Sequence, residues 1–380
     1  MIDPDIINLE RCAEVLKQHK LELVLLADPC SVAYLTGRAP AFEGGPNPWA
    51  GGPALAVLTY NHVCLIAPDS PSYTQQRDGW NVAEEGYQAY TCQYPLESAA
   101  AYHQAISSVV TSMAPRHAHI GIEAQWVPTA VRAVVADCTP DWSIIPVDGL
   151  FDGIRMVKSP REITLIRDAV RLGDVMQRAV REFSVKGMTE IEVFGLAKAR
   201  MEKIAAGRVP VRVALRGGCG SAEVWQGDPQ SYELHDGDLV LSDLLPQWHG
   251  YWSDSCSTTV VGGVPSAAQS RMHRAAREAL DIGIEAARPG IVAGELDRRV
   301  RGAVARHGYE YPHHTGHGLG VSLHEQPYIW KDAPTILAAG MVIALEPGAY
   351  VPAIGGVRQE VSLLITGDGA EILSHNALIL

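Results

Sequence analysis

The sequence lacks any arrangement of cysteines that would suggest disulfides or a thiolate metal site. Its seven cysteines are an odd number, and they are scattered along the chain without a short paired spacing. Such a pattern is typical of reduced thiols, so we expect a cytoplasmic protein rather than a disulfide-stabilised secreted one. The N-terminal stretch also lacks the basic segment and the following apolar segment of a secretory signal.

Long apolar runs and basic runs are missing as well. No apolar stretch reaches the roughly 18 residues that a membrane helix needs, so we expect no membrane partner. The formal net charge is −12, and no basic run offsets it, which argues against nucleic acid as a partner. An acidic chain is compatible with several carboxylates held together around a cation.

What the sequence does contain is enough apolar material for more than one core. The chain has 380 residues, 47% of them hydrophobic, so we expect a globular protein with two domains. Alternating strand-like and helix-like segments over residues 1–150 predict an α/β domain. A Ser-Pro-Arg-Glu helix start at 159–162 then opens a long amphipathic helix, and we place the boundary near 150–160. Helices and mostly antiparallel strands over 151–380 predict an α+β domain.

Two aspartates lie within apolar segments that predict strands, where aspartate is disfavoured. If Trp248 and His249 form the tip of a hairpin, Asp243 lies directly opposite Asp254, with Cβ atoms roughly 4.5–5.5 Å apart. Two carboxylates so close repel each other unless a proton or a cation lies between them. The alternative is that both face solvent or that one caps a turn, but a matched pair in apolar strands favours the cation.

Two glutamates occupy similar settings later in the chain. Glu346 ends an apolar segment immediately before Pro-Gly, and Glu360 has apolar neighbours in a predicted strand. A surface strand end would also explain Glu346, and an ordinary salt bridge with Arg358 would explain Glu360. With one histidine from the glycine-rich stretch 311–327, the four acids make a carboxylate-rich set that suits paired manganese, cobalt or zinc ions.

The order and spacing of these residues resemble the creatinase, aminopeptidase P, prolidase and methionine aminopeptidase family, whose catalytic domain has the pita-bread fold. The two aspartates are eleven residues apart, and Glu346 follows His317 by twenty-nine residues. The resemblance covers nearly the whole chain. It implies a creatinase-like N-terminal α/β domain at 1–150 and a catalytic pita-bread domain at 151–380, an antiparallel sheet with flanking helices. The N-terminal domain points away from the methionine aminopeptidase branch.

The resemblance also implies a role for each site residue. The ligands of two divalent ions, with Mn²⁺ first and Co²⁺ or Zn²⁺ as alternatives, would be Asp243, Asp254, His317, Glu346 and Glu360. A water between the ions would be the nucleophile, and Glu346 would accept its proton. His324 would stabilise the tetrahedral intermediate, and His313, which we count as a catalytic residue as well, would line the substrate pocket. Arg358 would lie beside the metals, while His314 is an extra histidine.

Two tryptophans bear on substrate binding. Trp225 stands near the position where proline-specific relatives usually carry a histidine; it can stack on a ring but cannot carry a proton. Trp49 lies in the glycine- and proline-rich segment 41–52, which is either a plain surface loop or a segment that closes the pocket across a dimer interface. We count both tryptophans, with Arg358 and His313, as candidate substrate-binding residues.

These residues together predict a dinuclear metallopeptidase. It would hydrolyse a C–N amide bond at the N-terminal end of a short peptide, most readily in Xaa-Pro dipeptides, and would form a homodimer. One alternative is hydrolysis of a different small amide or a cyclic amidine, as in an ectoine-type hydrolase. Another is a catalytically silent binding module of the same fold, but retention of all five ligands favours an enzyme.

Overall fold

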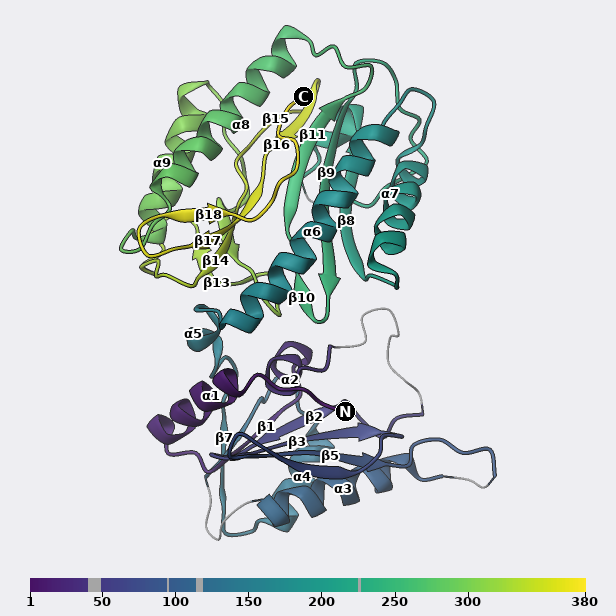
Figure 1. Ribbon diagram of the computed structural model, residues 1–380, viewed down its shortest axis with the longest axis vertical. Helices are drawn as coiled ribbons and strands as arrows, with labels where there is room; N and C mark the ends of the chain where they lie inside the picture. The colour runs from purple at the N-terminus through teal and green to yellow at the C-terminus, as the bar shows by residue number, and fades with distance from the viewer. Residues whose placement is uncertain (40–48, 94–95, 114–118, 225–226) are drawn as a thin grey trace. The chain divides into compact units, whose positions relative to one another are not determined.

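The computed structural model describes residues 1–39, 49–93, 96–113, 119–224 and 227–380. The chain divides into two compact units, Met1–Ile154 and Arg155–Leu380 (Figure 1). Within the described residues, no helix combines the length and the apolar character needed to cross a membrane.

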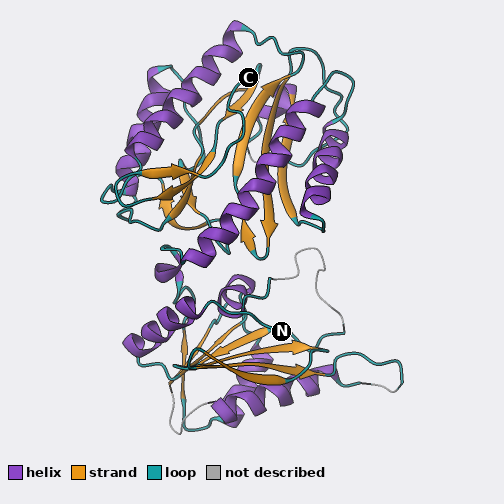
Figure 2. Ribbon diagram, viewed as in Figure 1, coloured by secondary structure: helices purple, strands orange, loops and turns teal. Residues whose placement is uncertain are grey.

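The N-terminal unit is built on one seven-stranded mixed sheet, in the order β4-β5-β3-β2-β1-β6-β7. Its strands are β1 (Leu23–Leu26), β2 (Leu55–Leu58), β3 (His62–Pro68), β4 (Tyr73–Arg77), β5 (Trp80–Tyr87), β6 (His119–Ile122) and β7 (Ser143–Pro146). Its helices are α1 (Ile6–His19), α2 (Pro29–Thr36), α3 (Ser98–Met113) and α4 (Thr129–Cys138), and the short α5 (Asp152–Arg155) crosses the division between the units along the chain. Helices α3 and α4 cover one face of the sheet, and α1 and α2 lie on the other (Figure 2). This arrangement confirms the predicted α/β domain.

The C-terminal unit contains antiparallel sheets between pairs of long helices. Strands β8 (Val211–Gly217), β9 (Leu239–Trp248), β10 (Tyr251–Trp252) and β11 (Ser255–Val260) form the first sheet. A five-stranded sheet follows the order β13-β12-β14-β17-β18 and comprises β12 (Gly316–Gly318), β13 (Glu325–Ile329), β14 (Val342–Leu345), β17 (Val361–Ile365) and β18 (Ala370–Ile372). A separate ribbon pairs β15 (Gly348–Val351) with β16 (Gly355–Arg358).

Four long helices cover these sheets. They are α6 (Pro160–Phe183), α7 (Glu190–Ala205), α8 (Ala267–Ala286) and α9 (Ala293–Arg306). One core joins α6 and α7 to the first sheet, and another joins α8 and α9 to the five-stranded sheet. The layers confirm the predicted α+β architecture (Figure 1).

The predicted start of α6 is confirmed by its cap. The Ser159 side chain accepts a hydrogen bond from the Glu162 backbone amide, and the Glu162 side chain accepts one from the Ser159 amide. Pro160 occupies the first turn, where its missing amide hydrogen costs nothing. The capping box therefore fixes the point at which the helix begins.

The predicted hairpin register is wrong. The turn consists of His249 and Gly250, both with positive φ (48° and 87°), as a two-residue hairpin with the right twist requires. Trp248 remains in β9 opposite Tyr251, so Asp243 pairs with Cys256 rather than with Asp254. The reason is that His-Gly adopts left-handed backbone more readily than Trp-His does.

Two acids also lie outside the strands in which we expected them. Asp254 lies between β10 and β11, where the Ser253 amide donates to the Pro246 carbonyl and the regular ladder is interrupted. Glu360 lies in the two-residue link between β16 and β17, which belong to different sheets. Both carboxylates therefore belong to short links between consecutive strands.

Candidate metal centre

The site is assembled from strand ends and links of the C-terminal unit. Asp243 extends from β9, and Asp254 immediately precedes β11. His317 is the middle residue of β12, and Glu346 directly follows β14. Glu360 lies in the link after β16. Segments that are more than a hundred residues apart in sequence thus bring these side chains to one place.

Three buried residues of the site lie especially close together. Ligand atoms of Asp254, His317 and Glu360 all lie within 4.8 Å of one another. His317 Nε2 is 3.4 Å from Asp254 Oδ2 and 3.8 Å from Glu346 Oε1. His317 Nδ1 donates to the Gly318 carbonyl at 2.9 Å, which leaves Nε2 directed at the carboxylates.

Arg358 is a cation that contacts two of these acids. Its guanidinium donates to the Asp243 carboxylate, and its Nη1 lies 3.7 Å from Glu346 Oε2. The salt bridge that we considered with Glu360 is therefore directed at other acids. One guanidinium leaves surplus negative charge on four clustered carboxylates, and such charge is costly when buried.

The pKa values show which of these acids resist ionisation in the buried site. Burial raises the pKa of Asp243 to about 8, although Arg358 beside it acts in the opposite direction. Burial and the neighbouring acids raise the pKa of Glu360 well above its ordinary value. For Glu346 burial also raises the pKa, but the hydrogen bond from His314 and the charge of Arg358 outweigh it, so the pKa is lowered.

These residues fit divalent cations. Within the described part of the chain, Asp243 Oδ1 and Glu360 Oε2 are buried without a hydrogen-bond partner. Buried carboxylate oxygens that lack donors are costly, and a cation removes that cost. Four carboxylates with one imidazole are the donor set that hard to borderline divalent ions prefer.

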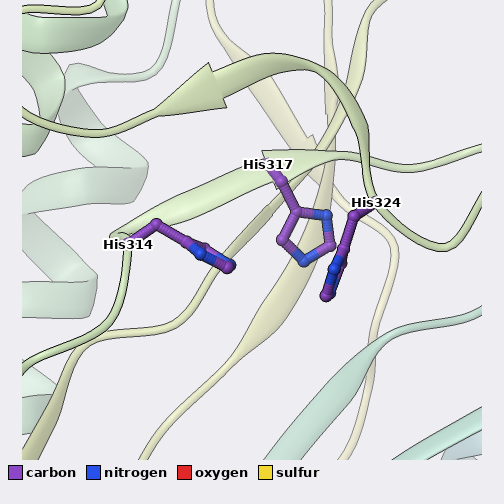
Figure 3. Close-up of side chains that lie close together, drawn as sticks. All are labelled: His314, His317 and His324. Carbon is purple, nitrogen blue, oxygen red and sulfur yellow. The ribbon is translucent and has the colours of Figure 1, made fainter.

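Three further histidines surround this centre, and Figure 3 shows two of them, His314 and His324, beside His317. His313 Nδ1 donates to the His314 carbonyl at 2.8 Å, so its Nε2 accepts from the Tyr350 hydroxyl at 2.8 Å. Burial lowers the pKa of His313 to about 4. His324 lies with its ring centroid 4.1 Å from that of His317, and burial together with His317 lowers its pKa to about 4. Both rings are therefore neutral near pH 7.

His314 and Tyr350 are site residues that the sequence did not assign. His314 Nε2 lies 2.8 Å from Glu346 Oε1, although we expected only an extra histidine. It precedes β12, so strand alternation gives no indication of where its side chain points. Tyr350 carries no signal beyond its closeness to Glu346 along the chain.

Comparisons with known proteins match both units. The model of metallopeptidase family M24 matches residues 164–367, and the model of the creatinase/prolidase N-terminal domain matches residues 8–157. The chain belongs to metallopeptidase family M24. It is therefore an enzyme of the peptidase class, and the family implies divalent metal ions at the site described above.

Relatives of this M24 peptidase align with 60% to 97% of its length. It is 29% identical to an Xaa-Pro dipeptidase of Pyrococcus horikoshii over 374 residues, which cover 97% of this chain and 98% of the relative. It is 35% identical to an Xaa-Pro dipeptidase of Pyrococcus furiosus over 230 residues, 60% of this chain and 66% of the relative. The crystal structure of the prolidase from P. horikoshii has a TM-score of 0.77 at 26% identity, covering 98% of this chain and 100% of that one. The two-domain creatinase/prolidase fold is thus confirmed.

The loop that carries His324 in the M24 peptidase is anchored by a buried ion network. Glu325 accepts from Lys158 Nζ at 2.6 Å and from Arg155 Nη2 at 2.8 Å, and Arg155 also donates to Ser322 at 2.5 Å. The three charged side chains are at most 9% exposed. Burial raises the pKa of Glu325, but the two cations outweigh it, so the pKa is lowered. Glu325 is therefore a structural partner of the site.

A cavity of about 930 Å³ opens beside the histidines of the M24 peptidase, with His313 and His314 in its wall. Arg298, Tyr309 and Trp330 contribute to the same lining. Its volume lies within the range of pockets that hold drug-sized ligands.

Two tryptophans are the remaining candidate substrate-binding residues of the M24 peptidase. Trp225 lies outside the described residues. Trp49 belongs to the N-terminal unit, is 59% exposed and packs edge-on against Tyr90, with ring centroids 5.4 Å apart. The role of either residue in substrate binding stays a prediction.

Proposed function

We propose that this M24 peptidase hydrolyses the amide bond between an N-terminal residue and a following proline, with Xaa-Pro dipeptides as the leading substrate class. The observation that carries the proposal is the buried group of Asp254, His317 and Glu360, whose ligand atoms lie within 4.8 Å of one another. The Xaa-Pro dipeptidase of P. horikoshii, aligned over 97% of this chain, supports the substrate class.

We propose that the site holds two Mn²⁺ ions, with Co²⁺ or Zn²⁺ as substitutes, because carboxylates outnumber imidazoles in the donor set. Asp243 would bind one ion, and His317 and Glu346 the other. Asp254 and Glu360 would be shared by both. When bound, such a pair supplies a water of lowered pKa and polarises the substrate carbonyl.

The side chains around the ligands have separate tasks. Glu346 accepts the proton of the attacking water, and its lowered pKa keeps it ionised for that purpose. His324 has a pKa of about 4, so its neutral ring donates a hydrogen bond to the oxygen on which charge develops. His313 is oriented by Tyr350 and lines the adjoining cavity, where the peptide binds.

We also propose a cytoplasmic homodimer in which Trp49 and Trp225 contact the substrate. The resemblance to branches whose N-terminal domain helps to form a dimer supports the assembly. None of the seven cysteines, all of which lie in the described residues, forms a disulfide, and Cys92 and Cys219 are exposed, which supports a reducing compartment. Light scattering of the purified protein measures the oligomeric state directly.

The test is a panel of Xaa-Pro dipeptides and matched dipeptides without proline, assayed on Mn²⁺-loaded protein with and without a chelator. We expect hydrolysis of the proline dipeptides, at least about tenfold higher kcat/KM than for their partners, and none with the chelator. Equal rates on both sets would contradict the proline preference. Turnover of a cyclic amidine instead would support the alternative hydrolase.

A further inference from the structure

Three histidine rings form a cluster that joins the proposed ligand His317 to two histidines outside the five-ligand centre. One ring nitrogen from each of His314, His317 and His324 lies within 4.8 Å of the other two. The ring centroids are 5.3 Å apart for His314 and His317, 4.1 Å for His317 and His324, and 5.5 Å for His314 and His324. Figure 3 shows His314 on one side of His317 and His324 on the other.

The cluster opens to solvent on the side of its two outer members. The His317 side chain is 1% exposed, whereas that of His314 is 31% exposed and His324 is an exposed residue. An ion arriving from solvent therefore meets the outer rings first. Small rotations of these rings would bring the nitrogens to the Zn–N distance of about 2.0–2.1 Å.

We propose that His314, His317 and His324 form an inhibitory site for a single Zn²⁺ ion. Three imidazoles with an open fourth position are a recurrent zinc ligand set, whereas Mn²⁺ prefers oxygen ligands. The inference rests on the proposed function, because the reaction that zinc would inhibit is the proposed hydrolysis of Xaa-Pro dipeptides.

Inhibition follows from the nitrogens that the ion would take. His317 Nδ1 donates to the Gly318 carbonyl, so Nε2 is the atom left for a metal. The same Nε2 faces Asp254 and Glu346 in the dinuclear centre, and one nitrogen serves only one ion. Zinc in the cluster would therefore withdraw His317 from the metal pair and His324 from the substrate carbonyl.

His314 distinguishes the two sites, because it would bind the ion in the cluster but only hydrogen-bonds to Glu346 in the metal pair. The experiment titrates ZnCl₂ into the full-length Mn²⁺-loaded enzyme, comparing the wild type with His314→Gln. His235→Gln, which removes an exposed histidine elsewhere, is the matched control. Each protein is scored against its own rate without zinc.

We expect the zinc concentration for half-inhibition to rise at least about tenfold in His314→Gln and to stay unchanged in the control. Zinc-edge X-ray absorption on protein with one added equivalent should show one imidazole ligand fewer in His314→Gln. Equal zinc sensitivity or an equal imidazole count in the two proteins would overturn the inference, because zinc would then act by replacing Mn²⁺. If the wild type hydrolyses no dipeptide, the proposed function fails, and the absorption spectra still decide the zinc site.

Discussion

Two buried acids, one in each unit, differ in whether their oxygens have hydrogen-bond donors. In the N-terminal unit, Glu123 accepts hydrogen bonds from two backbone amides at 2.8 Å each and from the Ser31 hydroxyl at 2.6 Å. In the C-terminal unit, Glu360 is 1% exposed, and its Oε2 is buried without a hydrogen-bond partner among the described residues. An acid with donors ties backbone segments together, whereas an acid without them is arranged for a ligand. The comparison separates structural acids from functional ones within one chain.

Removing an acid that lacks donors should have the largest effect. Glu360→Ala is expected to abolish metal binding and to lower kcat by more than about a thousandfold, because the carboxylate would be shared by both ions. Metal content by mass spectrometry and steady-state kinetics measure the two effects. Glu123→Gln is the matched change in the N-terminal unit and should keep both ions. Two ions per chain in Glu360→Ala would break the comparison.

Glu325 sharpens the comparison, because it is an acid of the C-terminal unit that has its partners. Glu325→Gln removes the carboxylate charge that pairs with the buried Lys158 and Arg155, so the free energy of unfolding should fall by about 3–5 kcal/mol. Urea denaturation measures this loss. A variant as stable as the wild type would show that the network does not hold the loop.

His324→Ala tests chemistry without changing the proposed ligand set. Two ions should remain, while kcat falls by about 10²–10³-fold through loss of a donor to the developing negative charge. Metal analysis and kcat on one protein sample report both quantities. Full kcat in this variant would remove the assigned role.

Metal removal should make stability depend on pH in the C-terminal unit. The folded-state pKa values of Asp243 and Glu360 are raised, so protonation favours the folded state, and stability falls as pH rises toward about 8. His313 and His324, with lowered pKa values, act the other way only below about 6.5. Between pH 6.5 and 8 the melting temperature of chelated protein should therefore decrease, and that of the Mn²⁺-loaded protein should change less. A flat profile for the chelated protein would contradict the assignment.

Trp49→Ala in the N-terminal unit should have the smallest effect. If the segment 41–52 closes the pocket, KM for a dipeptide rises several-fold, while kcat and metal content stay as they are. Stability should be unaffected, because the side chain is 59% exposed. Unchanged kinetics would leave the segment as a plain surface loop.

Local sequence signals predicted local features well. The capping box at Ser159 and Glu162 was readable because all of its determinants lie within four residues. The nature of the site was readable as well, because acids in apolar segments are rare enough to draw attention. Family resemblance then supplied roles that no spacing could supply.

The failures arose where tertiary structure decides. The predicted turn was one residue too early in the sequence, because the two residues with positive φ are His249 and Gly250. This shift changes every cross-strand pair, so Asp243 lies opposite Cys256. Glu360 looked like a strand residue because its neighbours are apolar, and nothing local announces a change of sheet. The sequence does not reveal the role of His314, because its contact with Glu346 joins residues thirty-two positions apart.

The position of Glu360 has a mechanical consequence. Arg358 is the last residue of the β15–β16 ribbon, and Val361 is the first residue of β17 in the five-stranded sheet. A cation bound by the Glu360 carboxylate would therefore link the β15–β16 ribbon to the five-stranded sheet. Metal binding would then also make the C-terminal unit more resistant to proteolysis.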